Sequence, residues 1–333
     1  MSNLEPAAVI EVCGNRAGVT GAPEFEVIAG RPVVLTPRQR VGEDGRLIAD
    51  PMTVSRYLPS HGRRMVGAWC FIDYYGPDDV SATRGMQVPP HPHCGLQTVS
   101  WLLAGEVLHR DSLGKRQLIV PGELALMTAG RGIAHAETSP TSPSRVLHGA
   151  QLWVALPAGE LDRTADFEHH ADLPRWRSGQ VSATVMLGRL GEISSPATIF
   201  SPLVGAELTV TAGAEATVPL VDDWEHAILV LDGAAELAGH RVEAGQFAYL
   251  GSGRDGLAIG SELGARMLLV GGEPFEEQIV MWWNFIGRSH DDISEARRAW
   301  MSGERFGTVD NYPGDRLPAP PMPPVRLKPR GRE

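Results

Sequence analysis

Short apolar segments that end at turn-forming residues recur along most of this chain. Glycine (38 residues) and proline (26 residues) make up about a fifth of the 333 residues, against roughly an eighth in average proteins. Turn-forming residues lie near the ends of most of the apolar segments, which occupy residues 66–75, 98–103, 106–109, 117–120, 124–127 and 151–156. Segments of this length at regular spacing are typical of antiparallel strands joined by tight turns. We therefore predict an all-β fold, a sandwich or a barrel, instead of a helical bundle.

The second half of the chain repeats the outline of the first. In each half an apolar strand stops at a glycine, a second strand returns, and a further glycine leads into another apolar strand. These glycines are Gly105 and Gly122 in the first half, and Gly233 and Gly245 in the second. The interval is shorter in the second half, which a shorter hairpin loop would explain. The pattern predicts two copies of one β-domain.

One helix is predicted near the C-terminus. Ser289 can cap its first turn, and Asp292 stands three residues later, as in a capping box. Ile293, Ala296 and Trp300 then recur at helical spacing. The segment from residue 312 onwards is rich in proline and has little periodicity, which predicts an extended strap or a disordered end.

The acidic charge and the few cysteines argue against several classes of protein. A net charge of −10 and a pI of about 5.6 disfavour a general grip on nucleic-acid phosphates or anionic lipid. Cys13, Cys70 and Cys94 are widely spaced and form no CxxC pair, so a disulfide scaffold is not expected. The sequence shows no signal-peptide pattern, and no apolar run reaches the roughly 18–20 residues that span a bilayer. We expect a cytoplasmic protein without direct membrane or nucleic-acid contacts.

The segment PPHPHCG at residues 89–95 is the strongest chemical signal. His91 and His93 are two residues apart, so in a strand both side chains point to one face, and the neighbouring prolines stiffen the segment. His135 and Glu137 have the same spacing in a second segment. Three imidazoles and a carboxylate suit one divalent first-row metal such as iron, with manganese, nickel or copper as alternatives. Such a set leaves coordination positions open, as in catalytic sites.

Several longer segments resemble the pirin family of the cupin superfamily. They are HPHCGLQTVSWLLAGEVLHRDSLG, PGELALMTAGRGIAHAE, QLWVALP, RMVGAWCFIDYYGP and VMWWNFIGRS. The resemblance covers roughly residues 30–310 and implies a bicupin, two antiparallel β-barrels of jelly-roll type. It also implies one metal per chain, typically iron, in the N-terminal barrel. The ligands of the family fall on His91, His93, His135 and Glu137.

The sequence departs from the wider cupin pattern at two places. Gln97 stands where that pattern has a glutamate four residues after the second histidine, so Glu137 must supply the carboxylate. The segment 130–135, Gly-Arg-Gly-Ile-Ala-His, keeps the histidine of a second motif and lacks its proline. Neither departure removes one of the four ligands that the pirin resemblance implies.

The repeat and the resemblance together predict five regions. We expect an N-terminal arm over 1–30, a metal-binding barrel over 31–157, a connector over 158–180, a second barrel over 181–287, and a helix with a proline-rich tail over 288–333. Alignment of the two copies places Val221 and Ala258 where the first copy has His93 and His135. The second barrel is therefore expected to carry no metal ligands.

Four further residues lie in or near the ligand segments. His109 and Asp111 fall in a return strand and its turn, and we interpret them as structural or solvent-facing residues. Gln97 is either a hydrogen-bond partner of a ligand histidine or a packing residue. Cys94 follows His93 directly, so in a strand its side chain points to the opposite face and away from the metal.

The resemblance implies two classes of function. Some pirins resemble quercetin 2,3-dioxygenases, which open a flavonol ring with O2 and release carbon monoxide; Glu137 would then act as the general base toward an enol hydroxyl. Other pirins are non-catalytic regulators, in which the metal state changes the surface offered to a protein partner. The same four ligands serve both functions, so the motif does not discriminate between them. We favour the enzyme acting on flavonol-like substrates.

Overall fold

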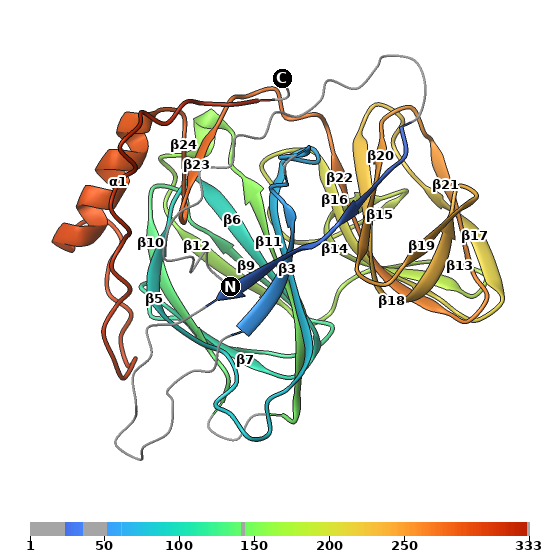
Figure 1. Ribbon diagram of the computed structural model, residues 1–333, viewed down its shortest axis with the longest axis horizontal. Coiled ribbons are helices and arrows are strands. Elements are labelled where there is room, and N and C mark those ends of the chain that lie inside the picture. Colours follow the sequence, from blue (N-terminus) through green and yellow to red (C-terminus); the bar gives the residue numbers. More distant parts are fainter. Residues whose placement is uncertain (1–23, 36–51, 61, 141–143, 332–333) are drawn as a thin grey trace.

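The computed structural model describes residues 24–35, 52–60, 62–140 and 144–331; Cys13 lies outside these ranges. Antiparallel strands form two barrels side by side, and a helix near the C-terminus lies against the first barrel (Figure 1). The all-β prediction is confirmed. The two barrels contain most of the buried apolar side chains, in separate clusters and in a cluster where the barrels meet.

The first barrel combines a seven-stranded and a four-stranded sheet. The larger sheet has the order β12-β9-β6-β11-β4-β3-β2, and the smaller one the order β5-β10-β7-β8. The strands are β2 (Arg31–Leu35), β3 (Met52–Leu58), β4 (Trp69–Asp79), β5 (Gln87–His93), β6 (Leu96–Ala104), β7 (Val107–Asp111), β8 (Arg116–Ile119), β9 (Leu124–Thr128), β10 (Ile133–Thr138), β11 (Val146–Ala155) and β12 (Asp166–His170). A short 3₁₀ helix, Ala158–Glu160, precedes β12.

The second barrel is built on the path β1-β20-β18-β22-β16-β14-β13, with β15, β17, β19 and β21 paired beside it. Its strands are β1 (Glu26–Ala29), β13 (Arg175–Ser178), β14 (Val181–Leu190), β15 (Ile193–Ser194), β16 (Leu203–Val210), β17 (Ala214–Pro219), β18 (Glu225–Leu237), β19 (His240–Glu243), β20 (Gln246–Gly251), β21 (Gly256–Ser261) and β22 (Ala265–Gly272). The order of these strands follows that of the larger sheet in the first barrel, in agreement with the predicted repeat.

One of the repeated glycines in each barrel lies where the backbone has a positive φ. Gly105, between β6 and β7, has a φ of +89°, and Gly233, inside the long strand β18, has a φ of +73°. A Cβ atom would lie 2.6 Å from the Val146 carbonyl oxygen at the first site and 2.2 Å from that of Gly264 at the second. Only glycine fits both the left-handed backbone and the close approach.

Each barrel is completed at one edge by a strand from outside the range predicted for it. β1 pairs with β20 of the second barrel although it precedes the first barrel in the sequence. β12 follows the first barrel and pairs with its strand β9. The end of the predicted N-terminal arm is therefore a strand of the second barrel, because its backbone groups complete the hydrogen bonding at the edge of that sheet. The rest of that arm lies outside the described residues.

The C-terminal segment forms a hairpin, a helix and an extended strap. The hairpin strands are β23 (Val280–Trp282) and β24 (Phe285–Gly287), and the helix is α1 (His290–Ser302). The predicted capping box of Ser289 and Asp292 is present, and Gly303 ends the helix in a left-handed conformation. No helix within the described ranges is long and apolar enough to cross a membrane. The tail is an extended strap as far as it is described.

This strap lies along the outside of the first barrel. The backbone N–H of Leu317 donates to the carbonyl of Pro90 in β5, at 2.8 Å, and the Trp300 indole N–H donates to Leu317, at 2.7 Å. Cys94, Ala134 and Ala136 are buried in one apolar cluster with α1 and the hairpin. The outer faces of β5 and β10 are therefore sealed by the C-terminal segment, and their other faces point into the barrel.

A buried histidine lies in the second barrel, where charge is unfavourable. His226 in β18 is 1% exposed and stacks on Trp224, with ring centroids 6.4 Å apart. Burial lowers the pKa of His226 from 6.5 to about 4. In the unfolded chain the ring regains the ordinary pKa. The unfolded state therefore binds the proton first as pH falls from 6.5 to 4, and folding stability decreases over that window.

We expect His226→Gln to weaken this pH dependence. Between pH 7 and pH 5, protonation of this one group in the unfolded chain should remove about 2 kcal/mol of stability in the wild-type protein. Denaturant unfolding at pH 7 and pH 5 measures the free energy of unfolding at each pH. Its decrease from pH 7 to pH 5 should be smaller in His226→Gln than in the wild type by that amount. The exposed His240 in β19 gives the control variant, His240→Gln, which should lose as much stability as the wild type. An equal loss in His226→Gln would contradict the prediction.

Candidate metal centre

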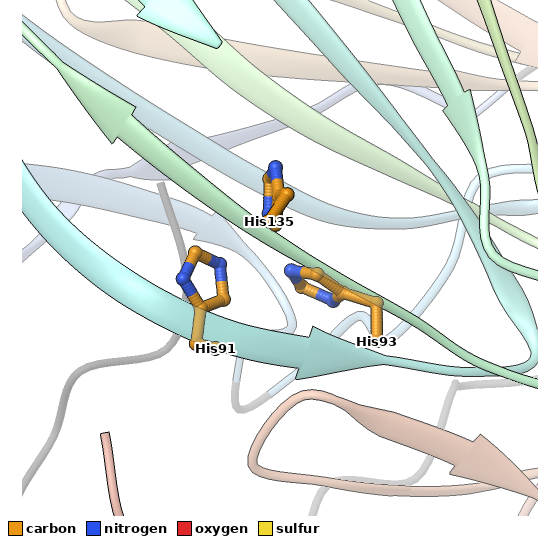
Figure 2. Close-up of side chains that lie close together, drawn as sticks. All are labelled: His91, His93 and His135. Atoms are coloured by element: carbon orange, nitrogen blue, oxygen red, sulfur yellow. The ribbon is translucent and has the colours of Figure 1, made fainter. Parts of the chain in front are cut away.

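Strand pairing assembles the predicted histidine group. β5 and β10 are antiparallel, and His135 lies directly opposite His91. His93 is two residues further along β5, so the alternation of side chains sends all three rings to one face, the barrel interior. Figure 2 shows the three side chains converging from the two strands.

The three rings are close and buried. One ring nitrogen of each histidine lies within 4.8 Å of the others. The ring centroids are 5.0 Å apart for His91 and His93, 4.3 Å for His91 and His135, and 5.0 Å for His93 and His135. Each residue is at most 2% exposed. A single ion between the rings could contact all three imidazoles.

The protonation states suit metal binding. Burial lowers the pKa of His91 to about 4 and also lowers the pKa values of His93 and His135, so the rings are neutral near pH 7. The Pro89 carbonyl, 2.8 Å from His91 Nδ1, can only accept, which leaves the lone pair of that ring on Nε2. The Nε2 atoms of His91 and His135 are buried and hydrogen-bond to none of the described residues. Buried nitrogens of this kind fit a metal ligand set.

Glu137 also faces the barrel interior, but outside this group. It is 1% exposed and lies two residues after His135 in β10; its carboxylate does not fall within the 4.8 Å group of the histidines. The Ser100 hydroxyl donates to Glu137 Oε1 at 3.2 Å, and the side-chain amide of Gln151 lies 3.0 Å from the same hydroxyl. The atom of Gln151 in this contact is Oε1, which is also an acceptor, so the single hydrogen of Ser100 serves either Glu137 or Gln151.

Sequence reasoning missed two residues behind His135. His109 and Asp111 are each 2% exposed, so the solvent-facing alternative for them is wrong. His109 Nδ1 lies 3.4 Å from His135 Nδ1, and His109 Nε2 lies 3.0 Å from Asp111 Oδ2. The register brings them there, because β7 pairs with β10 so that Asp111 lies opposite His135. The His-x-Asp spacing in a return strand was the available signal.

The two remaining candidates lie away from the ligand atoms. The Gln97 amide donates to Thr128 Oγ1 at 2.9 Å and to the Thr198 carbonyl at 3.1 Å, so its N–H groups do not support a ligand histidine. Cys94 packs on the opposite side of β5, as expected, and burial raises its pKa to about 11. A neutral thiol facing the C-terminal segment is not a metal ligand.

Sequence comparisons identify relatives over most of the chain. The pirin family profile matches residues 51–154, and the profile of the pirin C-terminal cupin domain matches residues 205–307. A protein of Pseudomonas aeruginosa, provisionally named a quercetin 2,3-dioxygenase, is 47% identical over 286 residues, which cover 86% of this chain and 90% of that protein. A pirin-like protein of Caulobacter vibrioides is 34% identical over 274 residues, 80% of this chain and 94% of the relative.

A solved structure agrees with these matches. The crystal structure of a quercetin 2,3-dioxygenase from Acinetobacter baumannii superposes with a TM-score of 0.83 at 39% identity, and the match covers 93% of this chain and 98% of that one. At 93% coverage the alignment extends into both barrels of this chain. Because both family profiles match in sequence order and the relatives align over most of their length, the chain belongs to the pirin family and carries its two cupin domains.

Proposed function

We propose that this protein is a metal-dependent dioxygenase of the quercetin 2,3-dioxygenase type that acts on flavonol-like enols with O2. The observation that carries the proposal is the buried group of His91, His93 and His135, with free Nε2 lone pairs on at least two rings. The names of the relatives from Pseudomonas aeruginosa and Acinetobacter baumannii point to the same reaction. The metal we favour is iron, because neutral imidazoles with a carboxylate suit it.

The three histidines would hold the metal, with Glu137 as the fourth ligand or as a base beside it. A divalent metal bound there supplies a Lewis acid that lowers the pKa of an enol hydroxyl. Glu137 accepts the hydroxyl proton, because a carboxylate within the same barrel is the base available to the substrate. Ser100 holds Glu137 Oε1 by a hydrogen bond and so fixes the direction of its lone pairs.

The walls of the barrel favour an aromatic substrate. Trp153 lies against His93 in a T-shaped contact, with ring centroids 5.1 Å apart, and Phe71 stacks on Trp153 at 4.0 Å. Both aromatic residues are at most 1% exposed. A buried aromatic wall next to the histidine group suits a planar polyphenol.

The ligand assignment predicts about one metal per chain in the wild-type protein and almost none in His91→Ala or His135→Ala. Removing one of three or four ligands should lower metal affinity by orders of magnitude, whereas the barrel core remains. Metal analysis after anaerobic Fe2+ loading and gel filtration measures the stoichiometry. His240→Ala removes an exposed histidine and should keep the metal. Stoichiometric iron in either site variant would contradict the assignment, and thermal melting checks that the variants fold.

The role of Glu137 predicts that Glu137→Gln loses flavonol turnover while the protein stays folded. The amide keeps the shape of the side chain but has neither charge nor basicity, so turnover should fall by about 10²- to 10⁴-fold. Oxygen consumption with a flavonol, measured on protein with a determined iron content, gives the rate per bound metal. Glu123→Gln is the matched control, since Glu123 pairs with His169 at 2.7 Å in the same barrel. Full turnover per metal in Glu137→Gln would exclude the base role.

A further inference from the structure

A row of three polar side chains runs outward from His135. Asp111, His109 and His135 are each 2% exposed and lie on neighbouring strands, β7 and β10. The His109 ring connects the other two, with Nε2 3.0 Å from Asp111 Oδ2 and Nδ1 3.4 Å from His135 Nδ1. The row ends at His135 Nε2, a buried nitrogen that hydrogen-bonds to none of the described residues.

The chemistry of the groups sets the direction of each hydrogen bond. A carboxylate only accepts, so His109 must carry its hydrogen on Nε2 and present a lone pair on Nδ1. That lone pair accepts from His135, which therefore carries its hydrogen on Nδ1. The lone pair of His135 is left on Nε2, and this is the tautomer that can bind a metal through Nε2.

Asp111 and His109 are each held in place by contacts with the surrounding fold. Asp111 Oδ1 accepts from the backbone N–H groups of Leu113 and Lys115, at 2.9 and 3.0 Å, so the carboxylate is oriented by the β7–β8 turn. The His109 ring stacks on Phe167 of β12, with centroids 4.3 Å apart and an interplanar angle of 18°. Neither ring nor carboxylate can turn without breaking these contacts.

We propose that Asp111 and His109 are positioning residues that fix the tautomer and orientation of His135 for metal binding. The proposal rests on the proposed metal-dependent function of the histidine group. Partners behind a ligand histidine typically change metal affinity by 10- to 100-fold when they are lost. In this protein the support comes from a second histidine held by a carboxylate, instead of from the carboxylate itself.

Asp111→Asn tests the direction of the two hydrogen bonds that connect Asp111, His109 and His135. The two backbone N–H groups hold an acceptor at the Oδ1 position, so the carbonyl oxygen of the new side chain stays there and its NH2 group turns toward His109. His109 must then accept on Nε2 and carry its hydrogen on Nδ1. His135 would in turn accept on Nδ1 and carry its hydrogen on Nε2, which blocks the nitrogen that faces the site.

The expected result is a 10- to 100-fold weaker binding of Ni2+ by Asp111→Asn, measured by competition with a chromophoric chelator. Asp79→Asn is the matched control. Asp79 Oδ1 also accepts a hydrogen bond from a backbone N–H, that of Ser81, but Asp79 is the last residue of β4 and its side chain faces solvent. Its affinity should equal that of the wild type. Unchanged affinity in a folded Asp111→Asn protein would overturn the proposal.

His109→Phe separates positioning from packing. Phenylalanine keeps a ring that can stack on Phe167 but offers no acceptor to His135. We expect a loss similar to that of Asp111→Asn, and no further loss when the two substitutions are combined, since Asp111 acts only through His109. If the losses of metal affinity add in the double variant, the two residues act independently. That result would contradict the proposal that Asp111 acts through His109.

The tautomer itself can be measured without any metal. Two-bond 1H–15N correlation spectra of the 15N-histidine-labelled, metal-free protein should show His135 protonated on Nδ1 in the wild type and on Nε2 in Asp111→Asn. A wild-type His135 protonated on Nε2 would overturn the proposal, and this test requires no variant to fold. If the wild-type protein binds no metal, the proposed function fails, while the spectra still decide which ring nitrogen of His135 carries the hydrogen.

Discussion

The antiparallel pairing of β5 with β10 is the interaction on which the candidate site depends. It places His135 opposite His91, and the alternation of side chains then puts every second residue of both strands inside the barrel. A register shift of one residue would turn the histidines outward and bring Cys94, Ala134 and their neighbours inside. The C-terminal strap opposes such a shift, because Leu317 is hydrogen-bonded to β5 and the apolar outer face is already covered by α1 and the hairpin.

The interior of the first barrel differs from that of the second in its polarity. Arg56 and Asp73 form a buried bidentate ion pair, with N–O distances of 2.7 and 2.8 Å, and Ser100 and Gln151 lie beside Glu137. The second barrel is filled mainly by leucine, valine, isoleucine and alanine. Burying charged groups costs several kcal/mol for each ion unless partners compensate, so an apolar filling would serve stability at least as well. Packing stability alone therefore does not account for the polar interior of the first barrel, whereas the filling of the second barrel is mainly apolar.

Local sequence patterns predicted the features that depend on near neighbours. The strand rhythm, the capping box at Ser289 and the inward pairs at 91/93 and 135/137 all follow from periods of two or from spacings of three. These patterns did not predict which strands pair when they are far apart in the sequence, or which residues lie opposite each other in such pairs. Nothing in residues 26–29 indicates that they pair with β20, and the spacing of His109 and Asp111 does not reveal that β7 lies beside β10. The position of the Glu137 carboxylate depends in the same way on Ser100, which comes from another strand.

Strand β12 links the connector between the barrels to the site in the first barrel. β12 belongs to the connector between the barrels, yet it completes the sheet of the first barrel beside β9. Its Phe167 stacks on His109, so the connector holds the ring that supports His135. The connector thus contributes one strand, and through Phe167 one aromatic contact, to the surroundings of His109 and His135.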